Sequence, residues 1–271
     1  MTLLVNILRV LFACVWTGMV GVPLLVFIYA AWAYGLLRAR FGRRDVLDRV
    51  LEANAYCTGW VAQRLWASVL LPLTGIRLRT REVTPIDWAT AHIICANHAS
   101  VFDILALVRA VPPPFRFVAK RELLKWPIIG WALRPAGQIV VDRGNHSSAM
   151  RTMTEAAQRQ IRGQVIFFVE GTRTRNGQLQ PFKKGAFHFA TDRQVKVLPT
   201  AVCGSYAVLA KVPWWRLRPG RHIEIVFCPP IDPLPRPSDE TAARAVETLR
   251  TLTREQIAAA LAGAEQPPTS V

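Results

Sequence analysis

The sequence is poor in acidic residues and in cysteine, and it lacks several short catalytic motifs. Only 18 Asp and Glu residues oppose 34 Lys and Arg residues, which gives a formal net charge of +16 and predicts an anionic partner. The five cysteines are scattered and include no CxxC pair, which argues against a disulfide framework and a structural zinc site. Neither a GxxxxGKS/T loop nor a GxSxG turn occurs, which excludes P-loop nucleotide hydrolases and the common serine hydrolases.

The sequence does contain enough apolar residues to form a core. Hydrophobic residues make up 51% of the 271 positions and charged residues 19%. This composition is typical of a folded chain rather than a disordered or fibrous one. The length allows one large domain or two small ones.

The N-terminal region is a long uncharged segment followed by arginines. No charged residue lies between Arg9 and Arg38, whereas a helix needs only roughly 20 apolar residues to cross a bilayer. We therefore expect a membrane-embedded helix over residues 10–37, with a cleaved signal peptide as the weaker alternative. Further arginines follow at positions 40, 43 and 44, and basic residues favour the cytoplasmic side of a membrane segment. The chain is therefore expected at the inner (cytoplasmic) membrane of the cell, with its remainder facing the cytoplasm.

Pro23 lies in the middle of this segment, and a second helical pattern follows the segment. Pro23 can kink the helix, which leaves a re-entrant hairpin open as an alternative to a single crossing. Residues 45–73 carry apolar side chains on one helical face, among them Leu47 and Leu51. We expect an amphipathic helix here that completes a membrane anchor over residues 1–75, although an ordinary core helix fits the pattern equally.

From Ile76 onward, short β-branched runs alternate with helical patterns. This alternation is typical of an α/β domain with a mixed, largely parallel sheet flanked by helices. The domain is expected to span residues 76–263 and to be followed by a flexible tail over 264–271. The expected strands cover residues 76–80, 92–95, 116–118, 138–141, 165–169, 196–198 and 223–227. The expected helices cover residues 103–110, 121–133, 147–162 and 185–191, followed by a C-terminal helix capped by Ser238 and patterned over 242–262.

Between the last two expected strands, two tryptophans and three arginines lie close together in the sequence: Trp214, Trp215, Arg216, Arg218 and Arg221. Such a cluster can contact lipid headgroups, stack on nucleic-acid bases or pack on the core. We favour the headgroups over nucleic-acid bases because an N-terminal anchor is expected and no helix-turn-helix, zinc-finger or RNA-recognition signature occurs, whereas packing of the tryptophans on the core fits equally. An anionic membrane is therefore an expected partner, and no nucleic acid is expected.

A polar stretch from Asn97 to Asp103 follows the expected strand 92–95. His98 and Asp103 can meet if the chain turns at the end of this strand, whereas five residues of continuous helix would keep them apart. Asp103 would then orient the imidazole, and His98 would accept a proton from a hydroxyl group. The structural alternative is that Asp103 only caps the following helix.

A second polar stretch, Glu-Gly-Thr-Arg at residues 170–173, follows the fifth expected strand. Ligands collect at strand ends in open α/β sheets, and Gly171 allows the backbone to approach an anion that Arg173 can bind in bidentate fashion. Downstream, Lys183 and Lys184 precede a helix whose free amide groups also attract an anion. Together these residues suit a phosphate monoester, although each stretch alone fits an ordinary turn.

Four blocks of sequence, taken in order, resemble the glycerolipid acyltransferases, specifically the 1-acylglycerol-3-phosphate acyltransferase family. The blocks are Asn97 to Asp103, similar to NHxSxxD; Lys120 to Arg143, similar to KxEL followed by P, G and DR; Phe168 to Gly185, similar to FPEGTR and PFKKG; and Val197 to Val202, similar to a proline-containing strand. The match spans residues 76–228. Val169 replaces the proline that usually precedes EGTR, and Thr200 replaces a common valine.

The resemblance implies the glycerolipid acyltransferase fold and a membrane-bound O-acyltransferase whose catalytic domain spans 76–263. Such an enzyme transfers a fatty acyl group from an acyl thioester to the free hydroxyl of 1-acylglycerol-3-phosphate, giving phosphatidic acid in phospholipid synthesis. His98 and Asp103 would be catalytic, Arg173 is the first candidate for binding the acceptor phosphate, and Lys120 is the next. The other implied substrate-binding residues are Asn97, Ser100, Arg143, Glu170, Gly171, Thr172, Lys183 and Lys184.

The resemblance implies no metal and no cofactor. The co-substrate would be acyl-CoA or an acylated carrier protein, and the acceptor would be a lysophospholipid. The alternatives are another lysolipid acceptor, such as a lyso-ornithine lipid or lysophosphatidylglycerol, a non-catalytic lipid-binding membrane tether, and a thioester hydrolase. Cys95 could carry an acyl group, but its place in an apolar strand favours a buried core thiol.

Overall fold

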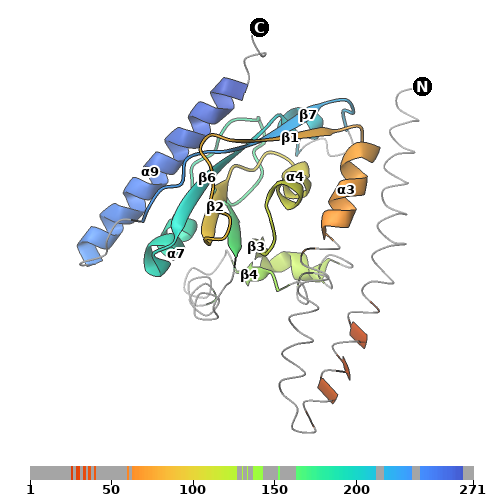
Figure 1. Ribbon diagram of the computed structural model, residues 1–271, viewed down its shortest axis with the longest axis horizontal. Helices are drawn as coiled ribbons and strands as arrows, with labels where there is room; N and C mark the ends of the chain where they lie inside the picture. Colours follow the sequence, from red (N-terminus) through yellow and green to blue (C-terminus); the bar gives the residue numbers. More distant parts are fainter. Residues whose placement is uncertain are drawn as a thin grey trace.

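The computed structural model describes residues 26, 29, 30, 33, 34, 36, 37, 40, 60, 63–126, 130, 133, 137–142, 152, 163–211, 217–233 and 239–264. Its helices are α3 (Gln63–Leu73), α4 (Phe102–Ala110), the 3-10 helix η2 (Arg121–Lys125), α7 (Gly185–Arg193), α8 (Ser205–Val208) and α9 (Asp239–Ala264). Its strands are β1 (Arg77–Glu82), β2 (His92–Ala96), β3 (Phe115–Lys120), β4 (Ile139–Val141), β5 (Gln164–Phe168), β6 (Lys196–Cys203) and β7 (His222–Phe227). Figure 1 shows their arrangement.

The strands form one seven-stranded sheet in the order β1-β7-β6-β2-β5-β3-β4. Strands β6, β2, β5, β3 and β4 are parallel to one another, whereas β7 is antiparallel to β6 and β1 is parallel to β7. The carboxyl ends of the five parallel strands therefore lie along one edge, together with the amino ends of β1 and β7. We call this the carboxyl edge, and ligands collect there in sheets of this kind.

Helices cover both faces of the sheet (Figure 1), as expected for this fold class. Alternate residues of the fully buried strand β2 belong to different cores, because successive strand side chains point to opposite faces. Ile93 and Cys95 lie in the core with α7 and α9, whereas Ile94 and Ala96 lie in the core with α3 and α4. The prediction of a mixed, largely parallel sheet flanked by helices is confirmed.

Strand β6 is longer than the expected strand 196–198, because Pro199 does not end it. The carbonyl oxygen of Pro199 accepts a hydrogen bond from the amide of Cys228, which directly follows β7. The missing N–H of Pro199 faces the same side, beyond the last paired residue of β7, so no ladder hydrogen bond is lost there. The strand therefore continues to Cys203 at the carboxyl edge.

The expected helix 121–133 begins as the 3-10 helix η2 instead of an α-helix. Gly130 and Leu133 are helical, and the residues between Trp126 and Leu133 other than Gly130 lie outside the described part. A Cβ atom on Gly130 would lie 2.2 Å from the carbonyl oxygen of Leu124, so only glycine allows this close approach.

Three other sequence expectations fall mainly on residues outside the described part. The expected helix 147–162 is described only at residue 152, which is helical. The cap Ser238 and the tail from 265 are not described, although α9 is. Of the aromatic and basic cluster, Trp214, Trp215 and Arg216 are not described, whereas Arg218 and Arg221 are exposed.

The N-terminal region is described at only a few positions. The residues described between 26 and 40 are helical and exposed, and they include Val26 and Leu37 with 64% and 61% exposure. The rest of the expected helix 10–37 lies outside the described residues. Within the described positions, no helix is both long enough and apolar enough to cross a membrane. Of the expected helix 45–73, the described helix α3 packs against α4, with Ala67 among its buried residues.

Candidate active site

His98 lies on the loop between β2 and α4, at the carboxyl edge of the sheet. Its Nδ1 lies 2.8 Å from Oδ2 of Asp103, which is the second residue of α4 and is fully buried. The same oxygen accepts the backbone N–H groups of Ala99 and Ser100 at 2.7 and 2.8 Å. The carboxylate therefore turns the loop and holds the proton on Nδ1, which leaves Nε2 of His98 available as a base.

The imidazole of His98 stacks on an aromatic side chain of the neighbouring strand. The ring of Phe168, the last residue of β5, lies with its centroid 3.9 Å from that of His98 and its plane inclined by 17°. Phe117 of β3 stacks in turn on Phe168, at 6.1 Å between centroids. Two contacts thus define the orientation of the imidazole, one through Nδ1 and one through the face of the ring. The sequence reasoning did not identify Phe168, although its position directly before the second polar stretch is a usable signal.

The side chain of Glu170 connects the loop that carries His98 to the loop that carries Gln180. Its Oε1 accepts the backbone N–H of His98 at 2.6 Å, and its Oε2 accepts the backbone N–H of Gln180 at 2.8 Å. The side chain is buried, and this burial raises the pKa of the Glu170 carboxyl above its ordinary value against the opposing effect of the two hydrogen bonds. Both oxygens are used within the fold, which indicates a positioning role for Glu170.

Asn97 and Ser100, both expected to bind substrate, also make contacts within the fold. The amide of Asn97 donates to the carbonyl oxygen of Val202 at 3.1 Å and accepts from its N–H at 2.7 Å. Asn97 therefore ties the end of β2 to β6. The buried hydroxyl oxygen of Ser100 accepts the N–H of Phe102 at 3.3 Å, at the start of α4.

The side chain of Arg173, like that of Lys183, makes no hydrogen bond or ion pair with any described residue. The side chain is half-buried, and it follows a turn in which Gly171 adopts the left-handed φ of 75° that favours glycine. Thr172 between them accepts a hydrogen bond from Nζ of Lys211 at 3.2 Å. Lys211 is a cation of this region that sequence reasoning missed, because nothing in the local pattern links it to residue 172.

The other expected cations that the structure describes lie at the same edge of the sheet. Lys120, at the end of β3, pairs with Glu122 at 2.9 Å. Lys184 pairs with Glu247 of α9 at 3.5 Å, and Lys183 is exposed. Arg143 lies outside the described residues. The two polar stretches thus meet through Glu170. Arg173 is the cation of these stretches, and its side chain has no partner among the described residues.

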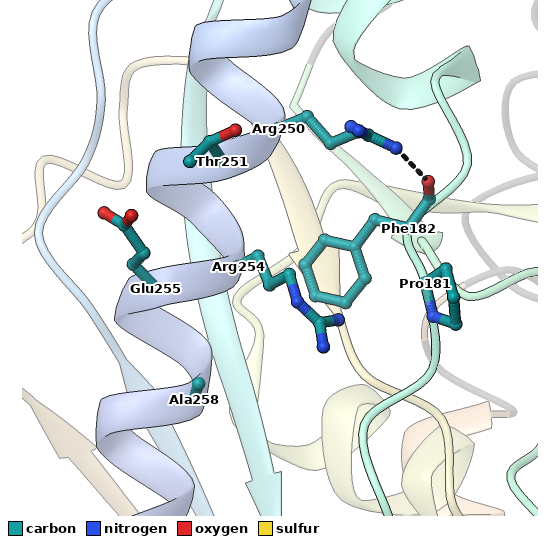
Figure 2. Close-up of a pocket in the computed structure, with 7 residues that line it drawn as sticks. All are labelled: Pro181, Phe182, Arg250, Thr251, Arg254, Glu255 and Ala258. Carbon is teal, nitrogen blue, oxygen red and sulfur yellow. Dashed lines mark hydrogen bonds between the residues drawn. The ribbon is translucent and has the colours of Figure 1, made fainter.

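A hollow of about 490 Å³ lies behind the second polar stretch, between α9 and the loop before α7. Figure 2 shows its lining residues, which are Pro181, Phe182, Arg250, Thr251, Arg254, Glu255 and Ala258. Arg254 donates to the carbonyl oxygen of Gln180 at 2.8 Å and lies over the ring of Phe182, and Arg250 donates to the carbonyl oxygen of Phe182. Helix α9 thereby holds the loop whose Gln180 in turn holds Glu170.

Cys95 is a core residue, as the sequence favoured. It is fully buried in β2, and burial raises the pKa of its thiol far above the ordinary value. The thiolate needed to carry an acyl group is therefore strongly disfavoured. The described residues also contain no group of three or more His, Cys, Asp or Glu side chains placed to hold a metal ion.

Comparisons with known proteins agree with this arrangement. A family model described as Acyltransferase matches residues 75–203, a range that contains both polar stretches. The chain is 38% identical over 136 residues to human 1-acyl-sn-glycerol-3-phosphate acyltransferase alpha, covering 49% of this chain and 48% of the relative. It is 34% identical over 165 residues to the 1-acyl-sn-glycerol-3-phosphate acyltransferase of Escherichia coli strain K12, covering 60% of this chain and 66% of the relative.

A solved structure shares the fold. The crystal structure of the 1-acyl-sn-glycerophosphate acyltransferase from Thermotoga maritima aligns with a TM-score of 0.56 and 22% identity, over 90% of this chain and 97% of the other. The chain spans about half the length of the first curated relatives that it matches. Its four ordered blocks and the match over residues 75–203 show that this part of the chain is an acyltransferase domain.

Proposed function

We propose that this chain is a membrane-bound O-acyltransferase that converts 1-acylglycerol-3-phosphate to phosphatidic acid. The acyl group comes from an acyl thioester, either acyl-CoA or an acylated carrier protein, and no further cofactor takes part. The observation that carries the proposal is the 2.8 Å contact between Nδ1 of His98 and Oδ2 of Asp103, at the sheet edge that also carries Arg173. The names of the matched relatives support the choice of acceptor.

The reaction needs one base and produces no covalent enzyme intermediate. Nε2 of His98 takes the proton from the free hydroxyl of the acceptor while that oxygen attacks the carbonyl carbon of the thioester. The carbon–sulfur bond then breaks, and the imidazolium returns the proton to the departing thiolate. Asp103 stabilises the imidazolium that forms between these steps, as its charge lies next to Nδ1–H.

Phe168 and Glu170 prepare His98 for this role without touching the substrate. The face of Phe168 lies against the imidazole, and an aromatic face attracts the cation that forms during proton transfer. Glu170 fixes the backbone of His98 through its amide. Placing the bound hydroxyl beside the thioester can itself lower the activation barrier by roughly 7 kcal/mol or more. A rigid loop around His98 therefore favours the reaction.

Arg173 is the residue that binds the acceptor phosphate. Its guanidinium has no partner within the described part of the chain, and its planar donor geometry matches a phosphate group in bidentate fashion. Lys211 lies near the turn that precedes Arg173, because its Nζ donates a hydrogen bond to Thr172. Lys183, which is exposed, is the next available cation.

The N-terminal residues support the proposed membrane location. Apolar side chains at positions 26, 36 and 37 are exposed on helical residues, and such side chains are normally covered by protein or lipid. The uncharged run over residues 10–37 and the arginines after it support an inner (cytoplasmic) membrane location with the catalytic domain in the cytoplasm.

An acceptor panel tests the proposal. The full chain in detergent is given acyl-CoA and, separately, 1-acylglycerol-3-phosphate, lysophosphatidylglycerol or a lyso-ornithine lipid, and products are separated by thin-layer chromatography. We expect turnover with the phosphate monoester, loss of turnover in His98→Ala and a raised KM for the acceptor in Arg173→Ala.

The same panel contains the results that would reject the proposal. Strong turnover only with the phosphate-free lyso-ornithine lipid would remove the role given to Arg173. Release of CoA at the full rate without any acceptor would identify a thioester hydrolase. Lipid binding with unchanged thioester consumption in His98→Ala would identify a membrane tether.

A further inference from the structure

The edge strand of the sheet carries a row of arginines that the proposed reaction does not use. Arg77, Arg79 and Arg81 alternate along β1, and all three are exposed. Alternation places them on one face, with successive side chains about 7 Å apart. Leu78, between the first two, packs on the core with α3 and α4, so the arginines point to the opposite face. That face is covered by α9 at β6, farther into the sheet.

Two more exposed arginines lie beyond the amino end of this row. Arg218 and Arg221 lie on the turn that leads into β7, and the carbonyl oxygen of Arg221 accepts the N–H of Arg77. The single acid of β7, Glu224, pairs with Arg81 at 3.4 Å. We call the five residues Arg77, Arg79, Arg81, Arg218 and Arg221 the arginine edge. On the face that carries Arg77, Arg79 and Arg81, β1 and β7 place one acid, Glu224.

The arginine edge begins at the carboxyl edge of the sheet. Because β1 and β7 run against the other strands, Arg77 and Arg221 lie at the amino ends that border the carboxyl ends of β6 and β2. His98 and Arg173 lie along the same border, after β2 and β5. A surface bound by Arg77 and Arg221 would therefore lie on the same side of the molecule as the proposed acceptor site.

We propose that the arginine edge docks on the surface of an anionic lipid bilayer. An open edge strand with evenly spaced arginines suits a plane of phosphate groups, each of which a guanidinium can bind in bidentate fashion. The exposed apolar side chains Val26 and Leu37 already indicate a lipid partner for this chain. Docking orients the catalytic domain so that the lipid acceptor reaches His98 from the membrane. This inference rests on the membrane-bound part of the proposed function and names the surface that makes the contact.

Hydrogen–deuterium exchange on the full chain in vesicles tests the docking directly. One vesicle type is phosphatidylcholine alone, and in the other about one lipid in three is phosphatidylglycerol. We expect slower exchange at residues 77–82 and 217–221 in the anionic vesicles, because docking covers the outward amides of the edge strand. Raising the salt concentration should reverse the protection, since the contact is electrostatic.

A charge-matched pair of variants separates the arginine edge from net charge. The test variant combines Arg77→Gln, Arg79→Gln and Arg221→Gln, and the control combines Arg109→Gln, Arg193→Gln and Lys196→Gln at the opposite edge of the sheet. Each arginine near an anionic membrane contributes about a fivefold preference, so the test variant should lose about a hundredfold of the docking equilibrium. The control should keep the wild-type protection.

Three results would overturn the proposal: no protection in the anionic vesicles, equal loss in both variants, or protection produced only by an acidic carrier protein or by duplex DNA added to phosphatidylcholine vesicles. Turnover in detergent is measured on the same variants and should match the wild type, because no bilayer is present. Protection without any acyl transfer by the wild type would reject the proposed function and leave the docking surface standing.

Discussion

At the scale of single residues, two buried carboxylates hold the loop around the imidazole. Asp103 accepts Nδ1–H of His98 and the amides of Ala99 and Ser100, and Glu170 accepts the amide of His98. Of these two carboxylates, only that of Asp103 contacts the imidazole ring that exchanges the proton. Substitutions at the two acids should therefore have different kinetic signatures.

Asp103→Asn keeps the size of the side chain and removes the charge beside His98. The imidazolium loses its stabilising partner, so kcat for acyl transfer should fall by about a thousandfold or more while KM for the acceptor changes little. Steady-state kinetics over a range of acceptor concentrations measures both constants, and thermal unfolding serves as the control for folding. A variant with turnover near that of the wild type would contradict the role of Asp103.

Glu170→Gln replaces one of two accepting oxygens by a donor that faces a backbone N–H. One buried amide of His98 or Gln180 then lacks an acceptor, which should lower the free energy of unfolding by about 1–3 kcal/mol and reduce kcat. Arg173→Ala, in contrast, should raise KM for the acceptor with little loss of stability. Denaturant titration and kinetics on both variants separate the roles, and a raised KM in Glu170→Gln alone would indicate direct substrate contact instead.

At the scale of elements, helix α9 supports the candidate site from behind. Arg254 binds the carbonyl oxygen of Gln180, Gln180 binds Glu170, and Glu170 binds the amide of His98. Three hydrogen bonds thus connect an exposed helix to the loop of the candidate base. Arg254, the first residue of this connection, lines the hollow shown in Figure 2.

Arg254→Ala removes the first of these hydrogen bonds and the contact with Phe182. Loss of an exposed charge-assisted hydrogen bond costs about 1 kcal/mol, so turnover should fall several-fold and amide exchange at residues 178–183 should quicken. Glu255→Gln, on the same hollow, is the matched control and should behave as the wild type. Equal effects of the two substitutions would show that α9 contributes only general stability.

At the scale of the whole molecule, a buried hydrogen-bonded cluster around His92 and Gln164 lies at the edge of the sheet opposite the candidate site. His92 at the start of β2 is buried, and its Nδ1 lies 3.2 Å from Oε1 of Gln164 at the start of β5. The amide of Gln164 donates to the carbonyl oxygens of Trp88 and Thr90. One side chain thus joins two strands and the loop before them.

The histidine of this cluster makes the stability of the domain depend on pH. Burial lowers the pKa of His92 below its ordinary value, so the unfolded chain takes up a proton before the folded chain does as the pH falls. Stability is therefore full above that value and is lost as pH falls from there through the folded pKa. The melting temperature of the wild type should fall more than that of His92→Phe between about pH 7.5 and pH 5. Parallel losses in the two proteins would contradict this assignment.

The pattern of strands and helices was largely predictable from the sequence, because burial on both faces makes β2 and β5 continuous apolar runs. Element ends were harder to place. The strand expected over 196–198 continues through Pro199 to Cys203, because β7 has already ended on the side that the proline nitrogen faces. Likewise, the close approach of Gly130 to the carbonyl oxygen of Leu124 in η2 is a contact that no local pattern encodes.

The sequence by itself determined the order of elements and the family blocks, and it predicted that His98 meets Asp103 if the chain turns between them, as the structure shows. The tertiary structure decided the contacts of Glu170 with His98 and of Asn97 with Val202, whose partners are 72 and 105 positions apart. In both of these contacts the partner is a backbone group, which every residue carries. Such a partner leaves no trace in the sequence, and only the packing of β2 between β5 and β6 brings it within reach.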